Sequence, residues 1–205
     1  MDVSAFATKG NLIKAKANLA LAKMGYDLMD KKRTILISEM MAYINRAEDI
    51  QARIDETFRT AYGELQNANV SLGINSVERI GYSIPEITQM RIRFRSVMGV
   101  EIPIVSIAPD EGNPFRYAFS NTNYPLDQAY LNFNKVKDLI VEMAEVENTV
   151  YRLAVNVKKT QKRANALESI MIPKLTGLVS SIQSTLDEKE REESSRLHVI
   201  KKSKA

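Results

Sequence analysis

The sequence predicts a mainly α-helical protein, in which the N- and C-terminal segments form a long antiparallel two-helix coiled coil around a small middle insert with a short β-hairpin. Three observations predict this fold. Apolar residues recur at alternating steps of three and four through both terminal segments, as in a coiled-coil seam. The middle contains a stretch in which apolar and polar residues alternate, as in β-strands. Five of the six prolines also lie there: Pro85, Pro103, Pro109, Pro114 and Pro125. We therefore divide the chain into 1–72, 73–126 and 127–205.

The first terminal segment has a seam in which only Arg33 and Thr57 are polar. Thr8 is a suitable N-cap for this helix, because its hydroxyl can accept a hydrogen bond from a free backbone amide. The pattern predicts a helix over roughly 10–69, about 90 Å long at 1.5 Å per residue. The seam consists of Leu12, Ala15, Leu19, Ala22, Tyr26, Met29, Arg33, Leu36, Met40, Tyr43, Ala47, Ile50, Ile54, Thr57 and Ala61.

The middle insert is predicted to contain a β-hairpin over Thr88–Ser106, where the alternation continues on both sides of Met98 and Gly99. One face of the first strand is apolar, with Met90, Ile92 and Phe94. The other face is basic, with Arg91, Arg93 and Arg95. Such a basic face could bind phosphate, but arginine on an exposed strand more often prevents edge pairing. Beyond the hairpin, Asn123 or Asp127 could cap the second long helix.

The second terminal segment continues the helical pattern to the C-terminal region. We expect a helix over roughly 127–197, about 105 Å long, which is the only candidate partner for the first. Pro173 removes a helical hydrogen bond and crowds the preceding turn, so a kink is expected there. The seam runs through Val136, Leu139, Met143, Val146, Val150, Leu153, Val157, Thr160, Ala164, Leu167 and Met171, and beyond the proline through Leu175, Leu178, Ile182 and Leu186.

Two long helices joined by a compact insert must lie antiparallel. Matching their ends places Arg33 near Asn165 and Glu168, which predicts a polar layer in the seam. Polar seam residues usually fix register, and a basic collar for a ring-shaped partner is the alternative. The same register places Gly25 opposite Pro173 and Gly177. This predicts a close, bent crossing, arising either from packing or from a functional curvature.

Composition argues against several classes of protein. Cysteine is absent, so disulfides, thiolate metal sites and cysteine nucleophiles are excluded. With one histidine, no P-loop and no GxGxxG motif, neither catalysis nor a cofactor or metal is expected.

The net charge of +4 comes from acids and bases that alternate, which argues against nucleic-acid binding. Lysines interrupt the apolar runs of the first 25 residues, and no run approaches the ~20 residues of a membrane span. We expect neither a signal peptide nor membrane insertion.

Two segments carry a family resemblance. Residues 163–202 contain N-A-L-E-x-x-x-I-P-x-L followed by L-x-E-x-E-R-E, and residues 7–36 contain a weaker G-x-x-L-x-x-K element. These segments resemble the two ends of the central-stalk D subunit of V-type ATPases, including the archaeal and bacterial A/V-type enzymes. The similarity covers both helices, whereas the middle matches in layout only.

The resemblance implies a non-catalytic rotor shaft of a rotary V-type ATPase or ATP synthase, cytoplasmic and peripheral to the membrane. Such a shaft couples ATP turnover in the ring of A and B subunits to rotation and to hydrogen-ion or other ion transport. Its implied partners are the F subunit, the A and B subunits, and the C (d) subunit, which links to the membrane rotor.

Two contact surfaces follow as hypotheses. Met90, Ile92 and Phe94 are expected to face helical residues, the F subunit or the membrane-rotor side. The expected contacts with the A/B ring are Lys31, Lys32, Arg33, Lys162, Arg163, Asn165, Glu168 and Arg191. The alternative function is a static coiled-coil scaffold or adaptor, which predicts an exposed apolar seam or a parallel homodimer. A third alternative, nucleic-acid binding by the arginine strand, predicts steeply salt-dependent affinity.

Overall fold

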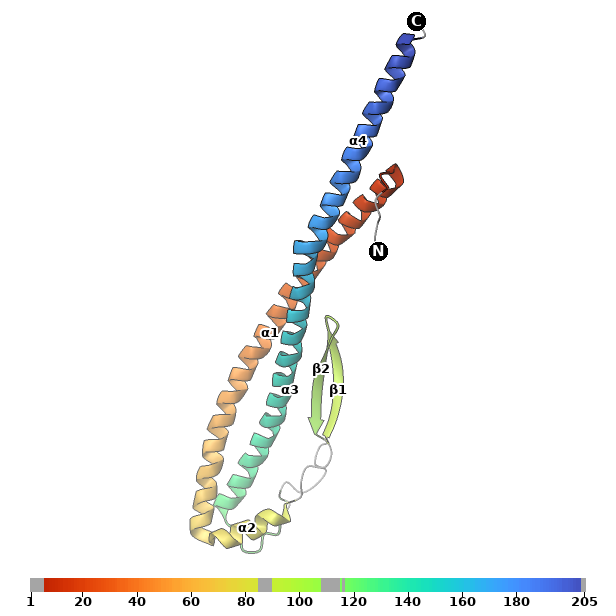
Figure 1. The fold of residues 1–205 in the computed structure, drawn as a ribbon. Coiled ribbons are helices and arrows are strands. Elements are labelled where there is room, and N and C mark those ends of the chain that lie inside the picture. Colours follow the sequence, from red (N-terminus) through yellow and green to blue (C-terminus); the bar gives the residue numbers. More distant parts are fainter. Residues whose placement is uncertain (1–5, 85–89, 108–114, 116, 204–205) are drawn as a thin grey trace. The chain divides into compact units, whose positions relative to one another are not determined.

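The computed structural model of the chain describes residues 6–84, 90–107, 115 and 117–203, and it confirms the mainly helical fold (Figure 1). The elements are α1 (Lys9–Leu72), α2 (Ile74–Ser83), β1 (Met90–Val97), β2 (Val100–Ile107), α3 (Tyr124–Ala166), the π-helical turn η1 (Leu167–Met171) and α4 (Ile172–Ser203). The chain forms two compact units, which are Met1–Ile35 with Val157–Ala205 (the terminal unit) and Leu36–Asn156 (the middle unit). Helices α1 and α3 contribute residues to both. The division into 1–72, 73–126 and 127–205 stays a prediction.

Side-chain caps explain where the long helices begin. The Asn11 amide donates to Thr8 Oγ1 at 3.2 Å, which confirms Thr8 as the N-cap of α1. Asn123 caps α3, because its Oδ1 accepts a 3.2 Å hydrogen bond from the Leu126 amide. Helix α1 ends before Gly73, whose φ of 82° is open to glycine but strained for other residues.

The middle unit has an apolar core between antiparallel stretches of α1 and α3. Ile50 and Ile54 of α1 pack with Leu139 and Val146 of α3, and all four are buried. The surrounding side chains are Tyr43, Ala47, Phe58, Met143 and Val150. All of these except Phe58 belong to the predicted seam, which is thereby confirmed in this unit.

The terminal unit pairs the start of α1 with the end of α3, η1 and α4, again in antiparallel order. Lys16 Nζ donates to Gln183 Oε1 at 3.4 Å, and Lys9 Nζ lies 2.9 Å from Glu190 Oε1. The buried side chains described in this unit are Ala15, Thr160, Ala164 and Ile182. All four lie on the predicted seam, yet three are small.

The π-helical turn η1 corrects the predicted seam near Pro173. Met171 was expected on the seam, but it is 48% exposed, and Ile172 is the half-buried residue instead. A π-helical turn bonds i to i+5 and so takes in one extra residue, which brings Ile172 rather than Met171 toward the partner helix. Proline lacks an amide hydrogen and clashes with the carbonyl four residues earlier, so a widened turn before Pro173 relieves both problems.

The predicted hairpin is confirmed. Strands β1 and β2 pair antiparallel, from Met90 with Ile107 to Val97 with Val100. The connecting residues Met98 and Gly99 both have positive φ, 51° and 77°. Two such residues form the turn whose twist matches a two-residue hairpin.

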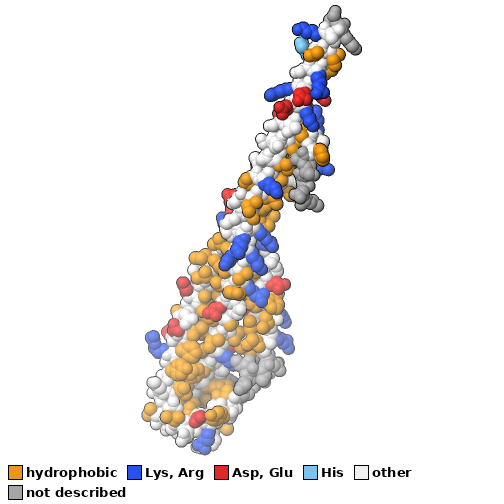
Figure 2. Space-filling model, viewed as in Figure 1, with side chains coloured by type: hydrophobic (Ala, Val, Ile, Leu, Met, Phe, Trp, Pro, Cys, Tyr) orange, Lys and Arg blue, Asp and Glu red, His pale blue; other side chains and the backbone are white. Residues whose placement is uncertain are grey.

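Apolar and charged side chains are interspersed on the surface seen in Figure 2. None of the helices in the described ranges is long and apolar enough to cross a membrane.

Candidate functional site

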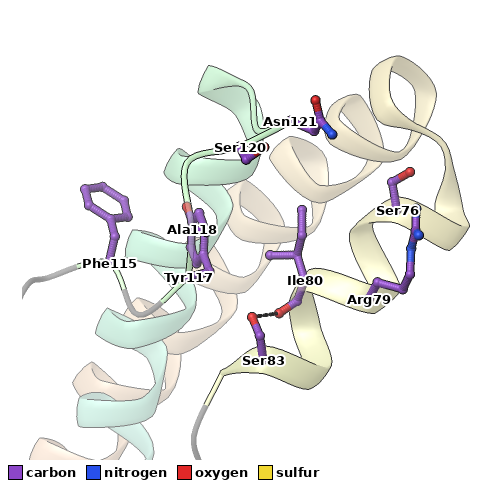
Figure 3. A pocket seen from close by; sticks show the side chains of 9 residues that line it. All are labelled: Ser76, Arg79, Ile80, Ser83, Phe115, Tyr117, Ala118, Ser120 and Asn121. Carbon is purple, nitrogen blue, oxygen red and sulfur yellow. Dashed lines mark hydrogen bonds between the residues drawn. The ribbon is translucent and has the colours of Figure 1, made fainter.

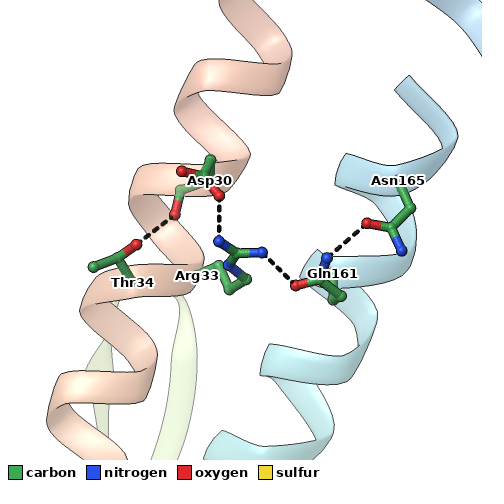
Figure 4. Close-up of polar contacts among 5 residues, drawn as sticks. All are labelled: Asp30, Arg33, Thr34, Gln161 and Asn165. Carbon is green, nitrogen blue, oxygen red and sulfur yellow. Dashed lines mark hydrogen bonds and ion pairs between the residues drawn. The ribbon is translucent and has the colours of Figure 1, made fainter. Parts of the chain in front are cut away.

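Arg33 is the centre of a polar layer in the terminal unit (Figure 4). Its Nη1 donates to Gln161 Oε1 at 2.6 Å, and its Nη2 lies 2.6 Å from Asp30 Oδ1. Gln161 in turn donates to Asn165 Oδ1 at 2.6 Å. The Nε atom of Arg33 is buried and has no hydrogen-bond partner among the described residues. The Gln161 contact joins the two helices, whereas Asp30 lies on the same helix as Arg33, so sliding the helices would cost the partly desolvated Arg33 its hydrogen bond to Gln161.

The polar layer differs from the predicted one by about a helical turn. Arg33 was expected beside Asn165 and Glu168, but it contacts Gln161 and reaches Asn165 only through that side chain. Glu168 lies instead near Tyr26, and its negative charge raises the pKa of that tyrosine above the ordinary value. The predicted register matched the two helix ends by residue number, and this ignores the extra residue that η1 inserts. It also cannot show which side-chain oxygen atom Arg33 binds.

A basic collar flanks this layer and consists of Lys31, Lys32, Lys162 and Arg163. The Arg33–Gln161 hydrogen bond places these residues at one level of the terminal unit, because each lies within two residues of Arg33 or Gln161 in the sequence. Lys32 is half-buried and the other three are exposed. Within the described residues none of the four forms an ion pair. The collar is therefore a patch of positive charge among the described residues. Arg191, predicted to lie in the same contact, is exposed on α4.

The crossing at Gly25 differs from the predicted one. Pro173 and Gly177 were expected opposite Gly25, but a Cβ built at Gly25 would lie 3.9 Å from Leu167 Cδ1. A Cβ at Gly177 would meet nothing within 4 Å. The close approach therefore involves the first residue of η1. The structure supplies the irregular turn that Pro173 suggested, but places it at Leu167–Met171, before the proline.

An exposed apolar row on α1 was missed, although the sequence carries a signal for it. The heptad count followed one stripe, whereas a second one, with steps of eight, three and four residues, lies on the same helix. Its members are 61–69% exposed: Ile13, Leu21, Met24 and Leu28. Exposed apolar side chains along one face of a helix make that face a candidate contact surface.

The hairpin is attached to α3 through β2. The Val105 amide donates to Glu145 Oε2 at 2.9 Å, and Arg152 Nη1 donates to the Glu101 carbonyl at 3.2 Å. The Arg152 guanidinium also lies 5.3 Å from the centre of the Phe94 ring, a cation–π contact. Phe94 thus faces a helical residue. Met90, Ile92 and Phe94 are nevertheless 52–57% exposed.

Helix α2 and an aromatic cluster form a further feature of the middle unit. The rings of Phe115, Tyr117, Phe119 and Tyr130 contact one another. Tyr117 Oη donates to Asp127 at 2.5 Å, and burial together with this bond raises the pKa of Tyr117 well above its usual range. Figure 3 shows the adjoining pocket, lined by Ser76, Arg79, Ile80, Ser83, Phe115, Tyr117, Ala118, Ser120 and Asn121. The every-third spacing of Ile74, Val77 and Ile80 is the sequence signal for α2.

The titratable groups of the described ranges form no cluster that could hold a metal ion. The described features that could contact other molecules are the basic collar, the apolar row on α1 and the hairpin.

Comparison with known proteins gives a consistent result along almost the whole chain. A family model described as the D subunit of ATP synthase matches residues 11–202. The V-type ATP synthase D subunit of Thermotoga neapolitana is 47% identical over 199 residues, covering 97% of this chain and 98% of the relative. The A-type ATP synthase D subunit of Methanopyrus kandleri is 35% identical, covering 95% and 84%. That of Methanosphaera stadtmanae is 33% identical, covering 95% and 92%.

Proposed function

Because the chain belongs to the ATP synthase D-subunit family, we propose that it is the central rotor shaft of a rotary V-type ATPase or ATP synthase. In this role it couples ATP turnover in the A/B catalytic ring to rotation and to ion transport at the membrane. It hydrolyses no ATP itself. The family match over residues 11–202 is the observation that carries the proposal.

The cross-connected helices support a shaft role. A shaft must transmit torque, so its two helices must not slide or twist past each other. In the terminal unit, polar contacts join the helices at the levels of Lys9, Lys16 and Arg33. In the middle unit, the apolar core and the 2.5 Å contact of Arg46 with Glu142 join them. Two helices linked at successive levels resist twisting better than one.

The terminal unit is the part that we assign to the A/B ring. The basic collar and Arg191 supply charge, and the apolar row on α1 supplies contact area. Asn165 and Glu168 complete the proposed contact beside the collar. An asymmetric shaft in a three-fold ring contacts each catalytic interface differently, so its angle biases which interface is open. This is a coupling between binding free energies.

The middle unit is the part that we assign to the remaining partners. Met90, Ile92 and Phe94 are the proposed contact with the F subunit or the membrane-rotor side, and the C (d) subunit links the shaft to the rotor ring. The assembled protein is then cytoplasmic and peripheral to the membrane.

Co-purification tests the rotor proposal. Tagged chain expressed in its own cells, crosslinked and isolated, is expected to yield a discrete assembly of fixed mass containing nucleotide-binding A and B subunits. Intact-mass measurement supplies the stoichiometry, and one copy of this chain per three A–B pairs is expected. The exposed apolar row also suits a static scaffold, which would instead give a homodimer or a variable set of partners without A and B. That result would contradict the rotor role.

Charge reversal tests the assignment of the collar to the ring. Lys32→Glu combined with Arg163→Glu should weaken assembly with the ring or uncouple ATP turnover from ion transport. Lys137→Glu, a charge reversal within the middle unit, is the control and should leave both unchanged. Normal assembly and normal coupled turnover in the double variant would refute the collar as a ring contact.

A further inference from the structure

We propose that the free edge of β1 binds an extended, acidic segment of a partner chain, which adds to the hairpin as a third β-strand. This refines the contact proposed above for the Met90, Ile92 and Phe94 face by stating the chemistry of its partner. Its test needs only the isolated chain, so its failure would leave the rotor proposal standing.

The two edges of the hairpin are unlike. The outer edge of β2 is closed by α3, since Glu145 accepts from the Val105 amide and Arg152 donates to the Glu101 carbonyl. Strand β1 is exposed over seven of its eight residues, and only Val97 is half-buried. A strand edge with free amides and carbonyls is a template for pairing with another chain.

The register identifies which groups of β1 face outward. In an antiparallel hairpin, directly opposite residues alternate between exchanging hydrogen bonds and pointing their backbone groups away from each other. Val105 points outward, because its amide bonds to Glu145, and so does its partner Ile92. Pro103, which has no amide hydrogen, occupies another outward position opposite Phe94. The outward residues of β1 are therefore Met90, Ile92, Phe94 and Ser96. Within the described ranges their amides have no recorded hydrogen-bond partner.

The side chains of β1 specify the partner's chemistry. Arg91, Arg93 and Arg95 project on one face, and no ion pair is recorded for them among the residues that the structure describes. The opposite face carries the half-exposed Met90, Ile92 and Phe94. A third strand that alternates acidic and apolar residues would place carboxylates beside the arginines and apolar side chains beside the apolar face.

The same geometry disfavours a second copy of this chain as the occupant. Residues directly opposite each other in an antiparallel pair project on the same face. Two copies of β1 joined at this edge would therefore place arginines opposite arginines in every allowed register, and like charges in that position repel. A nucleic acid would satisfy the arginines but leave the free amides and the apolar face without partners.

Two matched peptides test the proposal on the full purified chain. The probe is a fluorescein-labelled eight-residue peptide that alternates valine and glutamate, and its control has lysine in place of glutamate. At 0.15 M salt, fluorescence anisotropy should show at least tenfold tighter binding of the glutamate peptide. Hydrogen exchange at the Ile92, Phe94 and Ser96 amides should slow at least fivefold when it binds. The inward Val97 and Val100 amides report that the hairpin is intact.

Variants separate edge pairing from general charge attraction. Ile92→Pro removes an outward amide hydrogen, as Pro103 already does on β2, and should weaken binding at least fivefold. Ile92→Thr keeps the amide but loses apolar contact area, so it should weaken binding by at most half the factor seen for Ile92→Pro. Combined Arg91→Glu, Arg93→Glu and Arg95→Glu should reverse the preference toward the lysine peptide.

Several results would overturn the proposal. Equal affinity for the two peptides, or unchanged exchange of the outward amides, would refute a third strand. A single-stranded oligonucleotide that displaces the peptide, with affinity falling steeply in salt, would identify a nucleic acid as the occupant. Concentration-dependent self-association that Ile92→Pro abolishes would identify a second copy.

Discussion

The terminal unit and the middle unit use the same heptad seam but bury different side chains in it. The middle unit buries large apolar residues such as Ile50, Leu139 and Leu153. The terminal unit buries Ala15, Ala164, Thr160 and Ile182 among its described residues, and links its helices through Arg33, Lys16 and Lys9. Burial of apolar area stabilises in proportion to that area, whereas exposed ion pairs contribute little. We infer that the middle unit carries most of the stability.

The largest expected effect comes from the core of the middle unit. Ile50→Ala should lower the free energy of unfolding by about 2–5 kcal/mol, because it removes buried methyl groups and leaves a cavity. Urea denaturation followed by circular dichroism measures the change. Ile13→Ala, on the same helix but 69% exposed, should change it by less than about 0.5 kcal/mol. Equal losses in the two variants would contradict the assignment of Ile50 to the core and of Ile13 to the surface of α1.

The next effect tests whether a polar layer can substitute for such a core. Gln161→Ala should lower the free energy of unfolding by about 1–2 kcal/mol, because the partly buried Arg33 loses a hydrogen-bond partner. Amide exchange in residues 6–35 should rise more than in the middle unit. Gln51→Ala removes an exposed hydrogen bond to Asp55 and is the matched control, with little effect expected. If Gln161→Ala lowered the free energy of unfolding by more than Ile50→Ala does, the middle unit would no longer be the one that carries most of the stability.

A buried polar contact of the middle unit gives a pH-dependent test. Tyr117→Phe should cost about 1 kcal/mol at neutral pH through loss of the bond to Asp127. Because the folded pKa of Tyr117 is raised, the folded protein keeps this proton at a pH where the unfolded chain has lost it. Stability is therefore full below about pH 10 and falls as pH rises above it.

In Tyr117→Phe, the free energy of unfolding should fall less steeply above about pH 10 than in the parent. Urea denaturation at pH 9, 10 and 11 would detect the difference. Tyr151→Phe, at an exposed tyrosine of α3, is the control and should keep the parent profile. Parallel pH profiles for parent and Tyr117→Phe would contradict a raised pKa at Tyr117.

The features predicted correctly are those set by local pattern. Seam periodicity locates Ile50 and Leu139 in the core, and the alternation on both sides of Met98 and Gly99 locates the hairpin turn. The cap at Thr8 also depends only on residues within one turn. Such features can be predicted because neighbours in sequence determine them.

The features predicted wrongly depend on which distant groups meet. The π-helical turn shifts the seam from Met171 to Ile172, and a repeat count cannot show where a helix absorbs an extra residue. Arg33 selects Gln161 and Asp30 over Glu168 because of side-chain reach at one level of the pair. The roles of the collar and hairpin residues in partner binding stay predictions, since partners lie outside this chain.

The smallest expected effect is at the exposed ion pair of the terminal unit. The hydrogen bond and charge of Glu190 raise the pKa of Lys9, so any stabilisation is present below the ordinary lysine pKa and is lost as pH rises through the raised value. Both side chains are well exposed, 79% and 61%, so water and salt screen the pair. Lys9→Ala should leave the urea midpoint unchanged at neutral pH, in both low and high salt. Glu190→Gln should behave alike. If the urea midpoint fell in low salt but not in high salt, surface charge rather than the small seam residues would stabilise the terminal unit. The two units would then differ in electrostatics as well as in buried apolar area.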